Sequence, residues 1–312
     1  MNKGTVLITT SSFAKNDRNL LKAFTEQELQ IALNSYARKL TESEVCELIE
    51  QHQPVGMIAG VEPLPRSVLE KAKKLKVISR AGIGMDSVDL QAAKDFGIVV
   101  TNTPDAPTIP VAELTLGMIL SLLRRIHISD ASIRRGKWER PMGNLLHGKT
   151  VGTVGCGRIG TYLAGLLSFF GCIVIGCDPF IDKSDNFSLV GLEKILSDAD
   201  IISLHIPYNQ ENHHFINSER IQKMKKGALL INVARGGLID EDALHNALCS
   251  DHLGGAALDC FEEEPYTGKL KDLDNVLLTA HIGSYAQEGR VLMEKQAVEN
   301  LLRELKKAGC IK

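Results

Sequence analysis

Short apolar runs alternate with longer segments of helical periodicity along almost the whole chain. Such runs are the signal of buried strands, and ten of them stand out: residues 6–9, 55–59, 77–79, 98–101, 151–154, 173–177, 201–205, 229–233, 256–258 and 276–279. Strands that alternate with helices through short loops pair in parallel, with helices on both faces of the sheet. The alternation therefore predicts an α/β protein built on doubly wound parallel sheets.

Several helix boundaries are also readable. Thr41 and Glu44 have the spacing of a capping box, which predicts a helix from there to Gln51. Pro110 suits the first turn of a long apolar helix through residue 128. The more polar residues 129–149 predict a loop-rich excursion, and residues 287–307 predict one amphipathic helix.

Composition narrows the class of protein. The 312 residues are 44% apolar, which is enough for two buried cores. The 36 basic and 38 acidic side chains nearly cancel, so no global field attracts nucleic acid or a membrane surface. Seven cysteines without a C-x-x-C pair favour a reducing compartment over a disulfide framework or a zinc ribbon, and we predict no metal site. The sequence shows no targeting or membrane-spanning segment, so a cytoplasmic protein is expected.

The strongest local signal is a glycine-rich turn. Gly155, Gly157 and Gly160 follow the predicted strand 151–154 and open a helical pattern that runs to Phe170. In a dinucleotide fingerprint these glycines make the tight turn, admit a pyrophosphate and let the helix pack on the strand. The diphosphate would lie on the amides of the helix N-terminus, beside Arg158 and Ile159.

The next predicted strand ends in an acid, Asp178. A carboxylate at this position accepts hydrogen bonds from the ribose hydroxyls and repels a 2′-phosphate, so the sequence favours NAD over NADP. The alternative is a glycine-rich turn followed by an acid without function, and it leaves the matched strand, helix and acid unexplained.

Three later strands each end in polar side chains. Arg235, Glu264 and His281 all follow apolar runs, and the carboxyl ends of parallel strands meet along one crevice. A guanidinium binds a carboxylate through two parallel hydrogen bonds, and an imidazole exchanges protons near neutral pH. Downstream of a dinucleotide fingerprint, this combination predicts a site for hydride transfer.

Four ordered motifs resemble the signatures of the D-isomer-specific 2-hydroxyacid dehydrogenases, and the resemblance extends over nearly the whole chain. They are residues 155–160, 235–237, 259–265 and 281–283. Residues 136–140 and 178–179 look most like the phosphoglycerate dehydrogenase branch of that family. The resemblance thus implies an NAD-dependent oxidoreductase.

The resemblance also implies roles for single residues. Arg235 would hold the substrate carboxylate and polarise its 2-oxo group, His281 would exchange a proton with the 2-oxygen, and Glu264 would pair with His281. Further cofactor contacts are implied at five positions: Ile206, Val233, Ala234, Asp259 and Gly283. Further substrate contacts are implied at Arg80 and at the amides of Ile83 and Gly84.

Members of this family have a discontinuous substrate domain. By resemblance, residues 1–100 and 285–312 would form a flavodoxin-like substrate domain, and residues 101–284 an inserted Rossmann NAD domain. The segment around residues 120–149 would be the arm of a homodimer. No C-terminal regulatory domain is expected.

The substrate is less constrained than the reaction. The resemblance favours 3-phosphoglycerate and 3-phosphohydroxypyruvate, and hence serine biosynthesis. Glu62 would repel a phosphate if it pointed inward, whereas Arg66, Arg80 and Arg140 are either compensating cations or ordinary surface residues. A glycerate/hydroxypyruvate or glyoxylate reductase is therefore the second hypothesis. A binding protein that senses NAD(H) with the same fold is the third.

Overall fold

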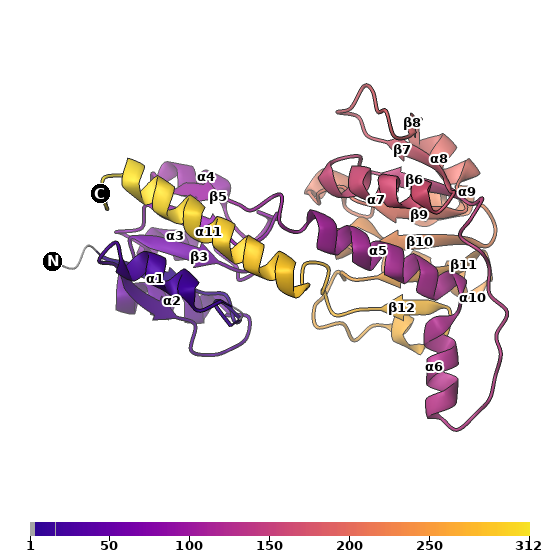
Figure 1. Cartoon of the computed structure of the whole chain (residues 1–312), viewed down its shortest axis with the longest axis horizontal. Coiled ribbons are helices and arrows are strands. Elements are labelled where there is room, and N and C mark those ends of the chain that lie inside the picture. Colours follow the sequence, from indigo (N-terminus) through magenta and orange to yellow (C-terminus); the bar gives the residue numbers. More distant parts are fainter. Residues whose placement is uncertain (1–3, 16) are drawn as a thin grey trace. The chain divides into compact units, whose positions relative to one another are not determined.

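A computed structural model describes residues 4–15 and 17–312, which form two compact units (Figure 1). One unit comprises Met1–Pro107 and Ser284–Lys312, and the other comprises Thr108–Gly283. Each unit is built on its own sheet, and every strand pair in both sheets is parallel. The predicted doubly wound α/β architecture is confirmed.

The sheet of the first unit has the order β2-β1-β3-β4-β5. This is the flavodoxin-like order, in which the chain changes direction between β1 and β3. The central strands are buried on both faces, which explains their continuous apolar sequence. The strands are β1 (Thr5–Ile8), β2 (Gln30–Leu33), β3 (Gly56–Ala59), β4 (Val77–Arg80) and β5 (Val99–Thr101).

Helices cover both faces of this sheet. One core lies under α2, α3 and α4, and a second core lies under α1 and α11. Figure 1 shows α11, in yellow, beside the strands of the N-terminal segment, so the two ends of the chain share one unit. The helices are α1 (Asn19–Thr25), α2 (Glu42–His52), α3 (Arg66–Lys71), α4 (Leu90–Asp95) and α11 (Gln287–Lys307). The capping box between Thr41 and Glu44 and the predicted helix 287–307 are both confirmed.

The sheet of the second unit has the order β12-β11-β10-β9-β6-β7-β8. The chain runs outward in one direction from β6 and then returns to β9 on the other side of β6. Ligands of such sheets bind at the carboxyl ends of the strands, where the direction changes. The strands are β6 (Thr150–Val154), β7 (Ile173–Cys177), β8 (Ser188–Leu189), β9 (Ile201–Leu204), β10 (Ala228–Asn232), β11 (Leu253–Leu258) and β12 (Val276–Leu278).

The helices of the second unit also lie on two faces. The core under α5 and α7 is separate from the core under α8, α9 and α10. The helices are α5 (Thr108–Leu123), α6 (Ile126–Arg134), α7 (Arg158–Phe169), α8 (Leu192–Asp198), α9 (Ser218–Lys223) and α10 (Glu241–Cys249). Three short 3₁₀ turns complete the unit: η1 (Gln210–Asn212), η2 (Gly236–Leu238) and η3 (Lys269–Asp272).

The prediction of one helix from Pro110 through residue 128 is wrong. The helix α5 ends at Leu123, and Arg125 has a left-handed backbone with φ of 53°, after which α6 begins at Ile126. A later segment contacts the C-terminal end of α5, since the amide of Asn144 donates to the Leu123 carbonyl at 2.8 Å. Residues 129–149 are consequently not all loop, because α6 continues to Arg134.

One helix and two strands were not predicted at all: α1, β2 and β8. The three 3₁₀ turns were not predicted either. Among the described residues, none of the helices has both the length and the hydropathy of a membrane span.

Candidate active site

The glycine turn joins β6 to α7 at the point where the sheet changes direction. Gly155 has φ of +92°, and a Cβ atom there would lie 2.7 Å from the backbone of His205. A Cβ atom on Gly160 would overlap the Gly155 carbonyl oxygen. Only glycine fits at either position. At Gly157, the N-cap of α7, a Cβ atom would have no other atom of the described residues within 4 Å. The turn therefore leaves space beside Gly157, where a dinucleotide fingerprint binds the diphosphate.

Asp178 directly follows β7 and is tied to the glycine turn. Its Oδ2 atom accepts a hydrogen bond from the Cys156 amide at 2.8 Å, and its Oδ1 atom accepts one from the Phe180 amide at 2.9 Å. Ile206, which follows β9, lies on the other side of the turn, with its Cγ2 atom 2.9 Å from the Cβ position of Gly155. Asp178 and Ile206 thus flank the open turn, and this geometry fits a bound dinucleotide.

A buried asparagine shapes the segment that carries Arg235. The Asn232 side chain, at the end of β10, accepts a hydrogen bond from the Ala234 amide at 3.0 Å and donates one to the Arg235 carbonyl at 2.8 Å. A Cβ atom on Gly236 would overlap the backbone carbonyl of Phe261. Because these two backbones touch, the Arg235 segment lies against the segment that follows β11. The sequence contained Asn232, but nothing in its pattern indicated this role.

The segment after β11 brings Glu264 to His281. The Nδ1 atom of His281 lies 3.0 Å from both carboxylate oxygens of Glu264. The two side chains are 39% and 36% exposed, so they are accessible to a ligand. Cys260 lies beside the pair, buried, with its Sγ atom within 4.8 Å of a ligating atom of each partner.

Asp259 holds the segment around His281. This carboxylate is 1% exposed and accepts three hydrogen bonds: from the Thr279 hydroxyl at 2.6 Å, the Ile282 amide at 2.8 Å and the Gly283 amide at 2.7 Å. These donors lie on both sides of His281, which has a left-handed backbone with φ of 53°. The hydrogen bonds of Asp259 position the segment that carries the histidine. Its place beside the cofactor stays a prediction.

The expected substrate residues of the first unit follow β4. Arg80 is buried, and its guanidinium donates to the Ala81 carbonyl. Ile83 is partly exposed, and its carbonyl accepts a hydrogen bond from the Asn102 side chain at 2.8 Å. Gly84 follows in the same loop. These residues belong to a different unit from Arg235 and His281.

Glu62 and Arg66, which were considered above for phosphate recognition, have specific partners. Glu62 is 2% exposed, and its carboxylate accepts hydrogen bonds from the Gly60 amide at 2.8 Å and from the Thr9 hydroxyl. Arg66 pairs with Asp95 on the surface. The Glu62 carboxylate is therefore engaged by partners inside its own unit, and the charge of Arg66 is balanced by Asp95.

All these segments of the second unit emerge from the carboxyl ends of its parallel strands: β6, β7, β9, β10, β11 and β12. A cavity of about 280 Å³ lies at the opposite edge, where its lining includes Ile201 and Ala228 at the amino ends of β9 and β10. We do not assign this cavity to the cofactor, because the glycine turn, Asp178 and His281 all lie at the carboxyl edge.

Comparison with known proteins identifies the fold family. Residues 116–283 match the family model described as "D-isomer specific 2-hydroxyacid dehydrogenase, NAD binding domain". NAD is therefore the cofactor of this domain.

Two curated proteins and one solved structure illustrate the similarity. The D-3-phosphoglycerate dehydrogenase of Methanocaldococcus jannaschii is 44% identical over 81% of the chain, which spans 50% of that relative's length. The hydroxypyruvate reductase of Thermotoga maritima is 38% identical over 90% of the chain and 92% of its own length. The crystal structure of the TT0316 protein from Thermus thermophilus superposes with a TM-score of 0.89, at 37% identity and 97% coverage of both chains.

Proposed function

Because this chain belongs to the D-isomer specific 2-hydroxyacid dehydrogenase family, we propose that it interconverts a D-2-hydroxy acid and the corresponding 2-oxo acid. The observation that carries this proposal is the hydrogen-bonded pair of His281 and Glu264, with Nδ1 3.0 Å from each carboxylate oxygen. This pair follows the carboxyl ends of strands in the same sheet that holds the glycine turn.

In the proposed reaction the cofactor and three side chains have separate roles. NADH, when bound, supplies the hydride that reduces carbon 2. Glu264 engages Nδ1 of His281, which leaves Nε2 to donate a proton to the 2-oxygen during reduction and to accept it during oxidation. The guanidinium of Arg235 binds the substrate carboxylate and polarises the 2-oxo group. One hydride and one proton together convert the 2-oxo acid into the alcohol, so the step balances.

The first candidate substrate is 3-phosphohydroxypyruvate, with 3-phosphoglycerate as its reduced partner. The 44% identity to a protein named D-3-phosphoglycerate dehydrogenase supports this choice. A role in serine biosynthesis would follow from this substrate.

A specific observation favours the second candidate, an unphosphorylated acid such as hydroxypyruvate or glyoxylate. Arg66 is engaged by Asp95, so it does not offer an unbalanced charge to a phosphate. A protein named hydroxypyruvate reductase is also 38% identical over 90% of the chain.

The experiment is a comparison of NADH oxidation with 3-phosphohydroxypyruvate and hydroxypyruvate, which differ only in the phosphate. The first candidate requires a higher kcat/KM for the phosphorylated acid, by at least about tenfold, or 1.4 kcal/mol of barrier. Equal or reversed values favour the second candidate, and glyoxylate is then added. Tight NADH binding without oxidation by any acid would leave only an NAD(H)-sensing protein.

Three further assignments belong to this proposal. The first unit would be the substrate domain, contributing the amides of Ile83 and Gly84. The protein would be cytoplasmic, in keeping with its odd number of cysteines. It would also be a homodimer, paired through the arm that contains α6 and residues 135–149.

The support for the dimer is a set of apolar side chains on this arm. Trp138, Met142 and Leu145 are 83%, 87% and 69% exposed. Large apolar side chains that are this exposed on one segment are typical of an interface. Light scattering should give the mass of two chains, and a Trp138→Ser, Met142→Ser double variant should shift it towards one chain. A monomeric wild-type protein would contradict this assignment.

A further inference from the structure

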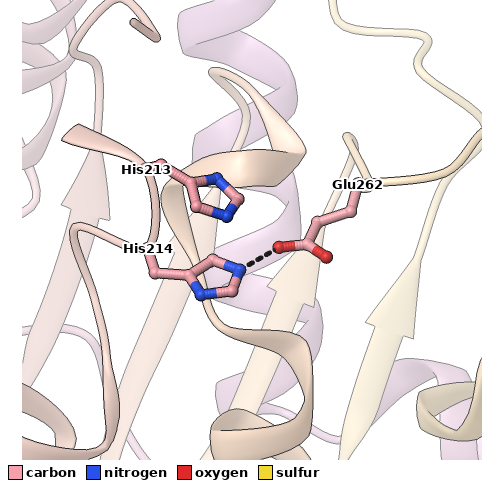
Figure 2. Close-up of side chains that lie close together, drawn as sticks. All are labelled: His213, His214 and Glu262. Atoms are coloured by element: carbon pink, nitrogen blue, oxygen red, sulfur yellow. Dashed lines mark hydrogen bonds and ion pairs between the residues drawn. The ribbon is translucent and has the colours of Figure 1, made fainter. Parts of the chain in front are cut away.

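Three side chains outside the proposed catalytic residues bring metal-ligating atoms together. They are His213, His214 and Glu262, and one ligating atom from each lies within 4.8 Å of those of the other two (Figure 2). The histidines follow η1, in the segment between β9 and α9, whereas Glu262 comes from the segment after β11. The cluster therefore joins two segments that are distant in sequence.

The backbone places both histidines on one side of their segment. Consecutive side chains of an extended chain point to opposite sides, but His214 has a left-handed backbone with φ of 51°. The two imidazole rings consequently stack, with their centroids 3.9 Å apart and their planes at 25°. Figure 2 shows both rings on the side of their segment that faces Glu262.

Hydrogen bonds outside the cluster fix this geometry. The amide of His214 donates to the Gly237 carbonyl at 2.8 Å. The amide of Glu262 donates to the Glu241 carboxylate at 2.9 Å. Both segments are thus held in place by bonds that do not use the imidazoles or the Glu262 carboxylate, and these side chains contact one another.

Ring nitrogen atoms of both histidines have neighbours within the protein. Nδ1 of His213 lies 3.2 Å from the Tyr208 hydroxyl. Histidines that bind metals usually hydrogen-bond through the other ring nitrogen, which fixes the tautomer and leaves a lone pair for the ion. Here that arrangement leaves Nε2 of His213 as the ligand. Nε2 of His214 contacts the Glu262 carboxylate directly.

We propose that His213, His214 and Glu262 bind a divalent transition-metal ion, for which Zn²⁺ is the probe. Two imidazoles and one carboxylate are a ligand set that suits Zn²⁺, Ni²⁺ or Cu²⁺, whereas Mg²⁺ and Ca²⁺ prefer oxygen ligands alone. Three protein ligands leave the fourth tetrahedral position to water. The ion would link the segment after β9 to the segment that carries Glu264. This site is independent of the proposed reaction.

A second set of possible metal ligands must be distinguished from this site by experiment. Cys260, Glu264 and His281 also lie within 4.8 Å of one another through their ligating atoms. They are the residues of the proposed catalytic pair and its neighbour, so inhibition by a metal would not identify which group binds it. The test therefore measures binding.

The test titrates the full chain with Zn²⁺ in competition with a chromophoric chelator and records the unfolding temperature with and without Zn²⁺. The wild-type protein should bind Zn²⁺ saturably and unfold at a higher temperature with it, because the ion binds only the folded chain. His213→Ala leaves the contact between His214 and Glu262 in place but removes one ligand. It should weaken binding by at least about tenfold and remove the rise in unfolding temperature.

Two more variants sharpen the result. Tyr208→Phe keeps the ring but removes the hydroxyl that engages His213, and it should weaken binding by about tenfold. His52→Ala, in the other unit, is the matched control and should bind Zn²⁺ as the wild-type protein does. If His213→Ala fails to fold, Glu262→Gln replaces it with the same expected loss.

Cu²⁺ offers a direct count of ligands. Its electron paramagnetic resonance spectrum should show coupling to two nitrogens in the wild-type protein and to one nitrogen in His213→Ala. The proposal is wrong if the wild-type protein binds no Zn²⁺ saturably. It is also wrong if His213→Ala binds as the wild-type protein does, or if binding disappears only in His281→Ala.

Discussion

The Nδ1 atom of His281 lies 3.0 Å from both carboxylate oxygens of Glu264, although the two residues are carried by segments that follow different strands. The left-handed backbone of His281 is an uncommon conformation for a residue other than glycine. It is supported by the three hydrogen bonds that Asp259 accepts from the same segment. The pair therefore depends on a buried acid that is not one of its two members.

Arg235→Lys should lower kcat/KM for the 2-oxo acid by at least about tenfold, or 1.4 kcal/mol of barrier. An ammonium group keeps the charge but loses the planar pair of donors that binds a carboxylate. Steady-state kinetics with NADH held at saturation measure the loss. Arg303→Lys, on the exposed side of α11 and paired with Glu304, is the control and should leave the kinetics unchanged. A smaller effect of Arg235→Lys would count against its role as the carboxylate anchor.

Asp259→Asn should lower both the free energy of unfolding and kcat. Hydrogen bonds to a charged acceptor contribute about 1.5–3 kcal/mol each, and an amide retains only one oxygen for three donors. We expect a loss of about 2 kcal/mol in urea unfolding. Glu263→Gln, an exposed acid of the same segment, is the matched control. Wild-type stability in Asp259→Asn would show that the carboxylate does not hold the segment.

Asp178→Ala should reduce the preference for NADH over NADPH. The carboxylate at the end of β7 lies beside the glycine turn, where it would accept hydrogen bonds from ribose hydroxyl groups and repel a 2′-phosphate. The ratio of kcat/KM for the two cofactors should fall by at least about tenfold. The control is Asp182→Ala, an exposed acid a few residues further along. An unchanged ratio would remove Asp178 from the cofactor site.

His205 should make stability depend on pH. Burial lowers the pKa of this imidazole from 6.5 to about 4, and its Nδ1 atom has no hydrogen-bond partner among the described residues. Between these values the unfolded chain binds a proton that the folded chain does not. The contribution of His205 to stability is therefore present above pH 6.5 and is lost as the pH falls towards 4.

The difference between the wild-type protein and His205→Gln isolates this effect from other titrating groups. Urea unfolding at a series of pH values should give a shallower decline on acidification for the variant, which has no imidazole to protonate. Parallel curves for the two proteins would contradict the assignment to His205.

Periodicity was sufficient to predict most of the fold. Continuous apolar runs predicted the strands because parallel strands are buried on both faces, as β3 and β9 are. Prediction from periodicity failed where contacts with distant segments determine the local structure. Nothing in the sequence marked the break at Arg125, because the left-handed turn depends on the distant Asn144 segment that binds the end of α5. The four residues of β2 carry only one fully buried side chain, so they lacked the apolar signal.

For the candidate site, the sequence indicated residue types at strand ends but not their partners. His281 and Glu264 were paired by resemblance, and the acid before Pro265 was chosen among three consecutive glutamates on the same basis. The roles of Asn232 and Asp259 depend on hydrogen bonds to backbone amides and carbonyls, which leave no trace in residue spacing. His213 and His214 were overlooked because their third ligand, Glu262, lies in a distant segment.

The central claim is that His281, held by Glu264, exchanges the proton that accompanies hydride transfer. The most direct measurement is single-turnover oxidation of bound NADH by the preferred 2-oxo acid, in the wild-type protein, in His281→Asn and in Glu264→Gln, with NADH affinity measured in parallel. We predict that His281→Asn lowers the rate by about 10²–10⁴-fold, that Glu264→Gln lowers it less, and that NADH affinity stays nearly unchanged. With 3-phosphohydroxypyruvate or hydroxypyruvate as the substrate, we also predict that the wild-type product is the D-isomer. A wild-type rate in His281→Asn, or an L-isomer product from either of these acids, would contradict this assignment.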